Sequence, residues 1–582
     1  MRYSGARILI ECLIEQGVDT IFGYPGGTVL FIYDELFKQK DRIRHVLTSH
    51  EQHAAHAADG YARASGKVGV CLATSGPGAT NLVTGIATAY MDSIPMVAIT
   101  GNVATNLLGK DSFQEIDIAG VTMPIVKHNW IVKDVRDLAE VVREAFVVAV
   151  SGRPGPVLID IPKDVTAEIA DWEPLDSAHR SPADVTARDL AIAAPAAAAR
   201  AARLAARTSA ASFTAADIDE AVRLLSSAKR PFLYSGGGVI ISDACSQLRE
   251  LAERLSAPVA MSLMGLGSLP SDHPLCTGMI GMHGTKASNM AVQRADLVVA
   301  IGARFSDRVT SKADTFAPNA DILHLDIDPA EINKNIKSEH WVVGDLKLTL
   351  GAILARLPPR VPTEWNGEIA EWRKQIPLAH SRDVPLHPRF LMEEVSRALG
   401  GEAIIATDVG QHQMWTAQFY PFTRPRSFVS SGGLGTMGFG AGAALGAAIS
   451  QPGRKAVLFT GDGSFRMNCG ELATMSNYHV PVLVIVVNNG VLGMVRQWQA
   501  LFYDERYAET TLTRPPDFVK LAEAYSLPAW LAKDEASFRT ALSAALKVIE
   551  SGKPALIEAR IDMDQQVLPM VPGGKAIDEQ FM

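Results

Sequence analysis

Gly461-Asp462-Gly463-Ser464 is followed, after a spacer of helical length, by the apolar run Val480-Pro-Val-Leu-Val-Ile-Val-Val487 and then by Asn488-Asn489. Both polar segments come directly after a predicted buried strand, and an open parallel sheet binds ligands beyond the carboxyl ends of its strands. Mg²⁺ takes oxygen ligands, one or two of them from protein side chains and the others from phosphates, carbonyls and water. The carboxylate of Asp462 and the amide oxygen of Asn489 therefore predict a magnesium ion that holds a diphosphate.

Glycines and a helix start add a phosphate-binding element at this edge. Gly461 and Gly463 let the backbone approach an anion closely, and a helix that begins near Ser464 points its first N–H groups toward it. Each half alone is more typical of an ordinary turn, because Gly-Asp-Gly and Asn-Asn are common turn sequences. The two halves together, each after a buried strand, resemble the signature of thiamine-diphosphate enzymes.

The length and composition of the chain limit its class. Its 582 residues suggest about three domains, and 47% hydrophobic residues with 47 glycines are typical of an α/β protein. A net charge of −8 without a long basic run favours neither nucleic acid nor a membrane surface as a partner, and the apolar runs are too short to span a bilayer. Five scattered cysteines without a CxxC pair, and a start without a secretory signal, predict a cytoplasmic protein with free thiols.

Two distant parts of the chain resemble each other. Residues 66–102 and 453–489 each contain a strand, a glycine turn, a helical stretch and a Pro-led buried strand, which is the pattern of βαβ units in a parallel sheet. A helix rich in small residues precedes each part, at 53–64 and 438–448. We expect two related doubly wound domains. Chance similarity between two βαβ units is the alternative, because such units are common.

A third α/β segment lies between these two parts. Its predicted strands, beginning at Pro231, Ala295 and Asp321, end in glycine or polar turns as in a Rossmann-like fold, although no GxGxxG motif is present. The predicted fold is therefore α/β, with three doubly wound parallel-sheet domains. Their predicted ranges are 1–178, 215–358 and 375–565, with an alanine-rich linker at 179–214 and a C-terminal tail at 566–582.

Further motifs resemble one branch of the thiamine-diphosphate enzymes, the catalytic large subunits of acetohydroxyacid synthases, also called acetolactate synthases. The resemblance covers almost the whole chain, and only the alanine-rich region lies outside it. The matching stretches are Phe22–Gly27, His50–Gln52, Ser112–Glu115, Gly152–Pro156, Pro162–Asp164, Gly281–Gly284, Gly302–Arg308, Asp408–His412, Gly435–Gly438, Gly493–Trp498 and Val567–Gly574.

The resemblance implies an activity and an assembly. The enzyme would decarboxylate pyruvate on thiamine diphosphate and ligate the hydroxyethyl enamine to a second 2-keto acid, pyruvate or 2-ketobutyrate, in the first common step of branched-chain amino acid biosynthesis. Its three domains would be a pyrimidine-binding domain, a central domain that holds FAD without a redox role, and a domain that binds diphosphate and Mg²⁺. The cofactor would lie between the first domain of one subunit and the third of another, so a homodimer or homotetramer is expected, with a possible small regulatory subunit.

The resemblance also assigns catalytic roles. Glu51 would hydrogen-bond the aminopyrimidine ring of the cofactor, although in isolation it is an ordinary helix-start acid. Gly27, Phe113, Gln114 and Lys163 would complete the catalytic pocket from the neighbouring subunit. Lys163 is equally typical of an exposed lysine at a helix start.

The second substrate would meet two further side chains. Arg308 would bind the carboxylate of the second 2-keto acid, a task that suits a planar bidentate donor, and Trp498 would shape its pocket. The ordinary alternatives are a surface salt bridge for the arginine and a core anchor for the tryptophan.

The cofactor contacts follow from the same resemblance. Asp462, Asn489 and the Val491 carbonyl would hold magnesium, the Gly435 carbonyl would accept from the cofactor's amino group, and Met437 would hold the cofactor bent. Ser306 stands where the family commonly has an aspartate, and the ordinary alternative for the triple glycine at 236–238 is a strand-end turn. The expected diphosphate-side contacts are Val409, Gly410, Gln411, His412, Gly463, Ser464 and Met494, and the expected FAD contacts are Arg153, Gly236, Gly237, Gly238, Leu263, Met282, His283, Arg304, Asp326, Ile327 and Asp345.

Several alternatives stay open within and outside this class. An FAD-free catabolic acetolactate synthase, or another thiamine-diphosphate decarboxylase or carboligase of 2-keto acids, fits the same core motifs. Glu51 argues against glyoxylate carboligase, and the pair Arg308 and Trp498 argues against pyruvate oxidase. A catalytically inactive binding subunit or nucleotide-binding scaffold is disfavoured, because Glu51, Asp462 and Asn489 are all present.

Overall fold

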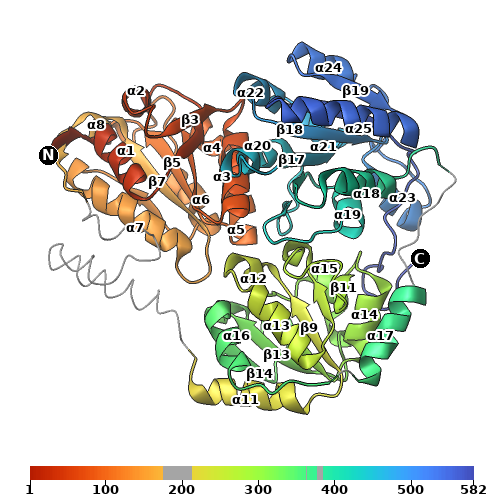
Figure 1. The fold of residues 1–582 in the computed structure, drawn as a ribbon. Coiled ribbons are helices and arrows are strands. Elements are labelled where there is room, and N and C mark those ends of the chain that lie inside the picture. Colours follow the sequence, from red (N-terminus) through yellow and green to blue (C-terminus); the bar gives the residue numbers. More distant parts are fainter. Residues whose placement is uncertain (175–212, 362, 376–383, 582) are drawn as a thin grey trace.

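The computed structural model describes residues 1–174, 213–361, 363–375 and 384–581 (Figure 1). These residues form three domains, each with a six-stranded parallel sheet and helices packed against it. The N-terminal and C-terminal domains lie side by side, and the central domain lies below them in the view of Figure 1. The predicted fold class is confirmed, while the linker predicted at 179–214 falls almost entirely outside the described residues.

The N-terminal domain is built on a sheet of order β3-β2-β4-β5-β7-β6. Its strands are β2 (Thr20–Gly23), β3 (Arg44–Leu47), β4 (Gly69–Ala73), β5 (Met96–Asn102), β6 (Asn129–Ile131) and β7 (Pro156–Pro162), and β1 (Arg2–Ser4) pairs antiparallel with β8 (Ile169–Asp171). Its helices are α1 (Gly5–Glu15), α2 (Leu30–Lys38), α3 (Glu51–Ser65), α4 (Pro77–Asn81), α5 (Val83–Asp92), α6 (Ile118–Thr122), α7 (Leu138–Val150) and α8 (Lys163–Ala167).

The C-terminal domain repeats this topology with the order β16-β15-β17-β18-β20-β19. Numbered along the chain, both sheets have the order 2-1-3-4-6-5, which favours two related domains over a chance match. The strands are β15 (Ile404–Thr407), β16 (Phe428–Val429), β17 (Ala456–Gly461), β18 (Val482–Asn488), β19 (Ala529–Ala532) and β20 (Ala555–Arg560). The helices are α18 (Pro388–Leu399), α19 (Gln411–Phe419), α20 (Gly440–Ser450), α21 (Asp462–Asn468), α22 (Glu471–Asn477), α23 (Gly493–Phe502), α24 (Phe518–Ala524) and α25 (Glu535–Glu550).

The central sheet has the order 3-2-1-4-5-6 along the chain, the order of dinucleotide-binding folds. Its strands are β9 (Pro231–Ser235), β10 (Val259–Met261), β11 (Cys276–Met279), β12 (Leu297–Ile301), β13 (Asp321–Asp326) and β14 (His340–Val343). Its helices are α11 (Ala215–Ser227), α12 (Gly237–Ile241), α13 (Cys245–Leu255), α14 (Lys286–Arg294), α15 (Asp307–Thr310), α16 (Leu346–Leu354) and α17 (Glu364–Gln375).

Helices α3 and α20 pack against each other where the N-terminal and C-terminal domains meet (Figure 1). Their small residues let the two backbones touch. A Cβ atom on Gly60 would lie 2.1 Å from the carbonyl oxygen of Ala443, and one on Gly446 would lie 1.8 Å from that of Ala57. One hydrophobic core runs through both domains at this contact, so α3 is held along its length by the partner helix.

Two segments pack on the central domain beyond its predicted range. Trp365 and Trp372 of α17 lie in the same hydrophobic cluster as Phe232 of the central sheet, although the predicted central domain ends at 358. Ile577 of the tail joins this cluster, and its carbonyl accepts a 3.0 Å hydrogen bond from Asn289 Nδ2. Apolar residues at helical spacing thus extend the central core, and the other predicted boundaries stay predictions.

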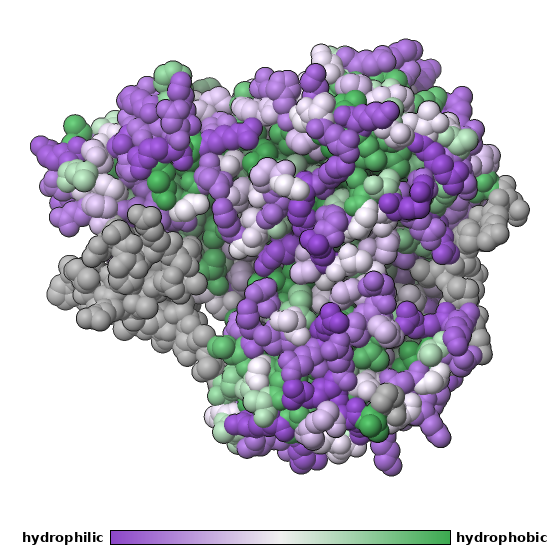
Figure 2. All heavy atoms as spheres, viewed as in Figure 1, coloured by the Kyte–Doolittle hydropathy of each residue, from purple (hydrophilic) through white to green (hydrophobic). Residues whose placement is uncertain are grey.

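One face of the molecule is drawn in Figure 2. Hydrophilic residues cover most of the face in Figure 2, with hydrophobic groups scattered between them. Among the described residues, none of the helices combines the length and the apolar character that crossing a membrane requires.

Candidate active site

The C-terminal sheet changes direction between β15 and β17, and such a switch point opens a crevice beyond the strand ends. Val409 and Gly410 lie shortly after β15, and Asp462 follows β17 directly. The parallel register pairs Gly461 with Val487, so Asp462 and Asn489 leave neighbouring strands at the same edge. The fold thus places these two residues at one edge of the sheet.

Asp462 is a buried carboxylate with one oxygen unpaired. The residue is 1% exposed, and its Oδ2 atom has no hydrogen-bond partner in the described part of the chain. Burial raises the pKa of Asp462 to about 6, while nearby backbone N–H groups, including that of Gly463, act in the opposite direction. A buried charged oxygen is costly unless it is paired, so the site fits a divalent cation.

Asn489 is oriented by a chain of side-chain amides. Its Nδ2 atom donates to Gln411 Oε1 at 3.0 Å, and its Oδ1 atom accepts from the backbone N–H of Val491 at 3.3 Å. Gln411 in turn donates to Gln497 Oε1 at 3.1 Å. A Cβ atom on Gly493 would lie 1.9 Å from Gln411 Oε1, which explains the glycine there. The amide oxygen of Asn489 thus has a fixed position at the sheet edge.

His412 lies in the first turn of α19 and packs on the glycine turn. Burial lowers the pKa of His412 to about 4, so the ring is neutral, and its Nε2 atom has no partner among the described residues. A Cβ atom on Gly461 would lie 2.8 Å from His412 Nδ1, and one on Gly463 would lie 2.6 Å from Leu492 Cδ2. These glycines are therefore also required by packing inside the protein, in addition to the predicted approach to an anion.

A cavity of about 70 Å³ opens between these groups. It brings together the three predicted metal ligands and all seven predicted diphosphate-side contacts. The predicted residues that line it are Val409, Gly410, Gln411, His412, Met437, Asp462, Gly463, Ser464, Asn489, Val491 and Met494.

A second cavity of about 2870 Å³ is lined by residues of all three domains. It includes the switch point of the central sheet, between β9 and β12. Gly435, Met437 and Met494 line it from the C-terminal domain. All eleven residues predicted to contact FAD also line it, namely Arg153, Gly236, Gly237, Gly238, Leu263, Met282, His283, Arg304, Asp326, Ile327 and Asp345.

The triple glycine of the central domain permits a close backbone crossing. A Cβ atom on Gly236 would lie 2.0 Å from the carbonyl oxygen of Gly302, and a Cβ atom on Gly238 would lie 2.7 Å from the Cα atom of Gly302. Asp326 ends the next strand, and burial raises the pKa of this carboxyl group to about 6. A deep cleft beside such a crossing, at a switch point, is a fitting place for a flat dinucleotide.

Arg153 differs from the other predicted FAD contacts because its charge is already engaged. Its guanidinium lies 3.1 Å from Asp328 and 2.7 Å from Glu331, and it donates to Ser93 Oγ at 2.8 Å. The arginine therefore ties the N-terminal domain to the central domain at the wall of the large cavity.

Arg308 and Trp498 face the large cavity from two domains. The side chain of Arg308 is 63% exposed, and its one ion pair within the described part of the chain is a long 3.9 Å contact with Asp307. Trp498 lies on α23, is 36% exposed and contacts the ring of Phe502. Because no close carboxylate of the described residues pairs with this guanidinium, it is able to bind the carboxylate of a ligand.

Glu51 is the first residue of α3, and its Oε2 atom accepts a 3.0 Å hydrogen bond from Asn81 Nδ2. Asn81 carries no motif and was not predicted. Gln114 packs against the glycine turn before α4, where a Cβ atom on Gly76 would lie 2.9 Å from the Cα atom of Gln114. A Cβ atom on Gly78 would lie 3.3 Å from Glu51 Oε1, so two glycines separate Glu51 from Gln114.

The five predicted catalytic residues lie outside the walls of both cavities. Neither cavity is lined by Glu51, Gln114, Lys163, Gly27 or Phe113. Phe113 is 88% exposed, and Gly27 and Lys163 are exposed as well. This half of the predicted site lies on the surface of the N-terminal domain.

Known families match all three domains. Residues 3–121 match the thiamine pyrophosphate enzyme N-terminal TPP binding domain, 218–353 match the central domain, and 408–559 match the C-terminal TPP binding domain. Together with the sheet edge at Asp462 and Asn489, these matches define a thiamine pyrophosphate enzyme.

Full-length relatives narrow the class. An acetolactate synthase large subunit from Parasynechococcus marenigrum (strain WH8102) is 47% identical over 98% of this chain and 90% of the relative. A probable acetolactate synthase large subunit from Methanocaldococcus jannaschii is 47% identical over 98% of this chain and 94% of the relative. An acetolactate synthase from Mycobacterium bovis is 46% identical over 99% of this chain and 91% of the relative. The chain belongs to the acetolactate synthase large-subunit family.

Proposed function

We propose that this protein is an acetolactate synthase, which decarboxylates pyruvate and joins the two-carbon unit to a second 2-keto acid, pyruvate or 2-ketobutyrate. The observation that carries the proposal is family membership over nearly the whole chain. Thiamine diphosphate, when bound, supplies the carbon nucleophile and the electron sink for this chemistry. The protein supplies the binding, orientation and proton positions around it.

Asp462, Asn489 and the Val491 carbonyl would hold Mg²⁺ at the diphosphate. The unpaired Oδ2 of Asp462 and the fixed amide of Asn489 support this assignment. Gly435 and Met437 would contact the aminopyrimidine. The diphosphate side would be lined by Val409, Gly410, Gln411, His412, Gly463, Ser464 and Met494.

Glu51 would hold a proton at the aminopyrimidine ring, with Asn81 fixing the position of its carboxylate. Gly27, Phe113, Gln114 and Lys163 would form the pocket wall around it. Because this group lies apart from the metal edge of its own chain, the active site would need a second copy.

A homodimer would join these two halves. Exposed apolar side chains lie in the segments that would meet, with Phe113 and Met123 on the N-terminal domain and Val495 and Tyr503 near α23. Such groups are typical of surfaces that become buried in an assembly. A tetramer and a small regulatory subunit stay predictions.

Arg308 would bind the carboxylate of the second 2-keto acid, and Trp498 would select its side chain. Support comes from the weakly compensated guanidinium and from the position of both residues on the large cavity. FAD would occupy the part of this cavity that lies on the central domain. A cytoplasmic location stays a prediction that rests on the free cysteines.

Product analysis tests this function. The purified protein is given pyruvate and 2-ketobutyrate together, with Mg²⁺ and thiamine diphosphate, with and without added FAD. We expect 2-acetolactate and 2-aceto-2-hydroxybutyrate, and a flavin spectrum in the purified protein. Release of acetaldehyde or acetate alone would contradict the proposal, and FAD-independent activity from a colourless protein would point to the catabolic enzyme instead.

A further inference from the structure

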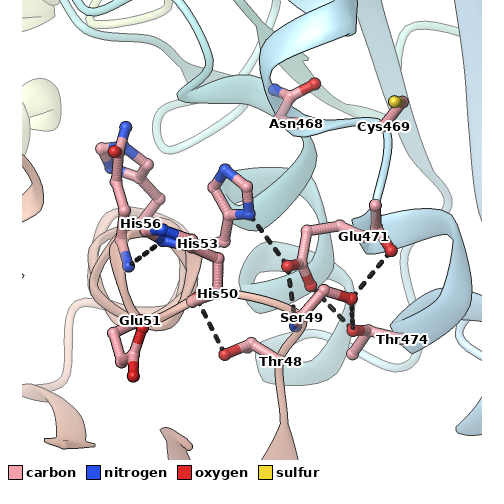
Figure 3. Close-up of polar contacts among 12 residues, drawn as sticks. Thr48, Ser49, His50, Glu51, His53, His56, Asn468, Cys469, Glu471 and Thr474 are labelled. Atoms are coloured by element: carbon pink, nitrogen blue, oxygen red, sulfur yellow. Dashed lines mark hydrogen bonds and ion pairs between the residues drawn. The ribbon is translucent and has the colours of Figure 1, made fainter. Parts of the chain in front are cut away.

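One buried carboxylate of the C-terminal domain holds the start of α3 (Figure 3). Glu471 is the first residue of α22 and is 0% exposed. Its Oε1 atom accepts from the backbone N–H of Ser49 at 2.9 Å and lies 2.9 Å from His53 Nδ1. Its Oε2 atom accepts from Thr474 Oγ1 at 2.7 Å. Both oxygens of this buried side chain therefore have hydrogen-bond partners.

The two residues that Glu471 contacts flank Glu51 in the sequence. Ser49 lies two residues before Glu51, and His53 lies two residues after it. The same loop has further anchors on the C-terminal domain, because Ser49 Oγ donates to the Gly470 carbonyl at 2.8 Å and Leu47 N donates to Tyr478 Oη at 2.9 Å. In Figure 3 the Glu51 side chain points away from Glu471, so the contact acts on the backbone and not on the carboxylate itself.

The two domains also meet at a second, larger contact. Helices α3 and α20 already pack closely along their length, and Gly60 and Gly446 allow that approach. Glu471 adds order at one place only, the turn where the loop enters α3. Ser49 lies just before α3 and His53 lies in its first turn, so both contacts act on the start of the helix.

We propose that Glu471 is a positioning residue for Glu51. By fixing Ser49 and His53 it sets the direction in which the first turn of α3 presents the Glu51 carboxylate. This inference rests on the proposed catalytic function of Glu51. It adds a residue of the C-terminal domain, more than 400 positions away in sequence, to the parts that set the reaction rate.

Amide hydrogen exchange on the cofactor-free protein tests the positioning directly. In Glu471→Ala we expect exchange in residues 48–56 to rise about tenfold or more while the rest of α3 stays protected. Glu471→Gln keeps an acceptor oxygen at the same place and should restore most of the protection. Glu394→Ala is the matched control, because Glu394 is also a buried carboxylate of the C-terminal domain but lies on α18. Unchanged exchange at 48–56 would overturn the inference. An equal rise in exchange along the whole of α3 would also overturn it.

Steady-state kinetics provide the second readout. Glu471→Ala should lower kcat about tenfold or more with little change in the KM for pyruvate, because small displacements of a reacting group cost rate steeply. In a Glu51→Gln background the same substitution should add less than about twofold, since residues that act through one group are not additive. Full additivity of the two losses would overturn the inference.

The outcomes separate the inference from the function on which it rests. Full activity of Glu51→Gln would refute the proposed role of Glu51, whatever Glu471→Ala does. If Glu471→Ala does not fold, His53→Leu removes one of the two anchors and leaves α22 intact. Unchanged exchange and unchanged kcat in His53→Leu would then overturn the inference.

Discussion

The carboxylate of Asp92 accepts a 2.7 Å hydrogen bond from the backbone N–H of Gly433. It also accepts from Gly432 N at 3.0 Å and from Arg63 at 2.9 Å. Asp92 is the last residue of α5, whereas Gly433 lies two positions before Gly435. The N-terminal domain thus fixes the loop of the C-terminal domain that carries two of the proposed aminopyrimidine contacts.

Replacing Asp92 should weaken cofactor binding. Asp92→Ala removes the acceptor of the Gly432 and Gly433 N–H groups, and each such hydrogen bond contributes about 0.5–1.5 kcal/mol, so the loop is expected to move. We expect the dissociation constant for thiamine diphosphate, from fluorescence titration at fixed Mg²⁺, to rise about tenfold or more. Glu394→Ala should bind like the wild type. An unchanged constant in Asp92→Ala would refute the link.

The contact between α3 and α20 should tolerate no side chain at Gly446. In Gly446→Ala the new Cβ atom would lie 1.8 Å from the Ala57 carbonyl oxygen, and relief of such overpacking costs about 1–3 kcal/mol. Thermal unfolding should show a lower Tm for this variant. Gly351→Ala, on helix α16 with open space around its Cβ position, should keep or raise Tm. Equal Tm values in both variants would contradict the packing argument.

Asp160 should make stability depend on pH. Burial raises the pKa of this carboxyl group to about 7, although hydrogen bonds from Asn102 and Thr100 lower it. A raised folded-state pKa favours folding at low pH, and this contribution is lost as pH rises toward 7. The Tm of Asp160→Asn minus the Tm of the wild type should therefore increase from pH 5 to pH 8. Parallel Tm curves across that range would argue against the burial effect.

Trp498 should set the choice of the second substrate. Trp498→Leu removes most of an aromatic wall from the large cavity, and discrimination by one hydrophobic contact is worth about 1–3 kcal/mol. With pyruvate and 2-ketobutyrate in competition, we expect the preference for 2-ketobutyrate to fall by about tenfold. The product ratio, measured by chromatography, is the readout. A ratio equal to that of the wild type would exclude the assignment.

The sequence predicts those parts of the site that lie just beyond strand ends. Asp462 and Asn489 each follow an apolar run with strand character, and the parallel register then brings them together. Contacts between distant segments carry no such local signal. Ser49 and Glu471 are 422 residues apart, and nothing near either residue indicates the pairing.

The same reason explains the other differences. Asn81 follows no motif, so its contact with Glu51 appears only once α4 is placed beside α3. Helix α17 has apolar residues at helical spacing, but the domain that receives them depends on tertiary packing. The separation of Glu51 from the metal edge is likewise a property of domain arrangement, which no local pattern encodes.

Binding of thiamine diphosphate to the wild type and to Asp462→Ala, measured by isothermal titration calorimetry with and without Mg²⁺, tests the central claim most directly. The account predicts tight binding to the wild type only with Mg²⁺, and a loss of about a hundredfold or more in the variant, because the buried carboxylate is a ligand of the ion. Asp272→Ala, at an exposed position, should bind like the wild type. Equal, Mg²⁺-dependent affinity in the wild type and Asp462→Ala would contradict the account.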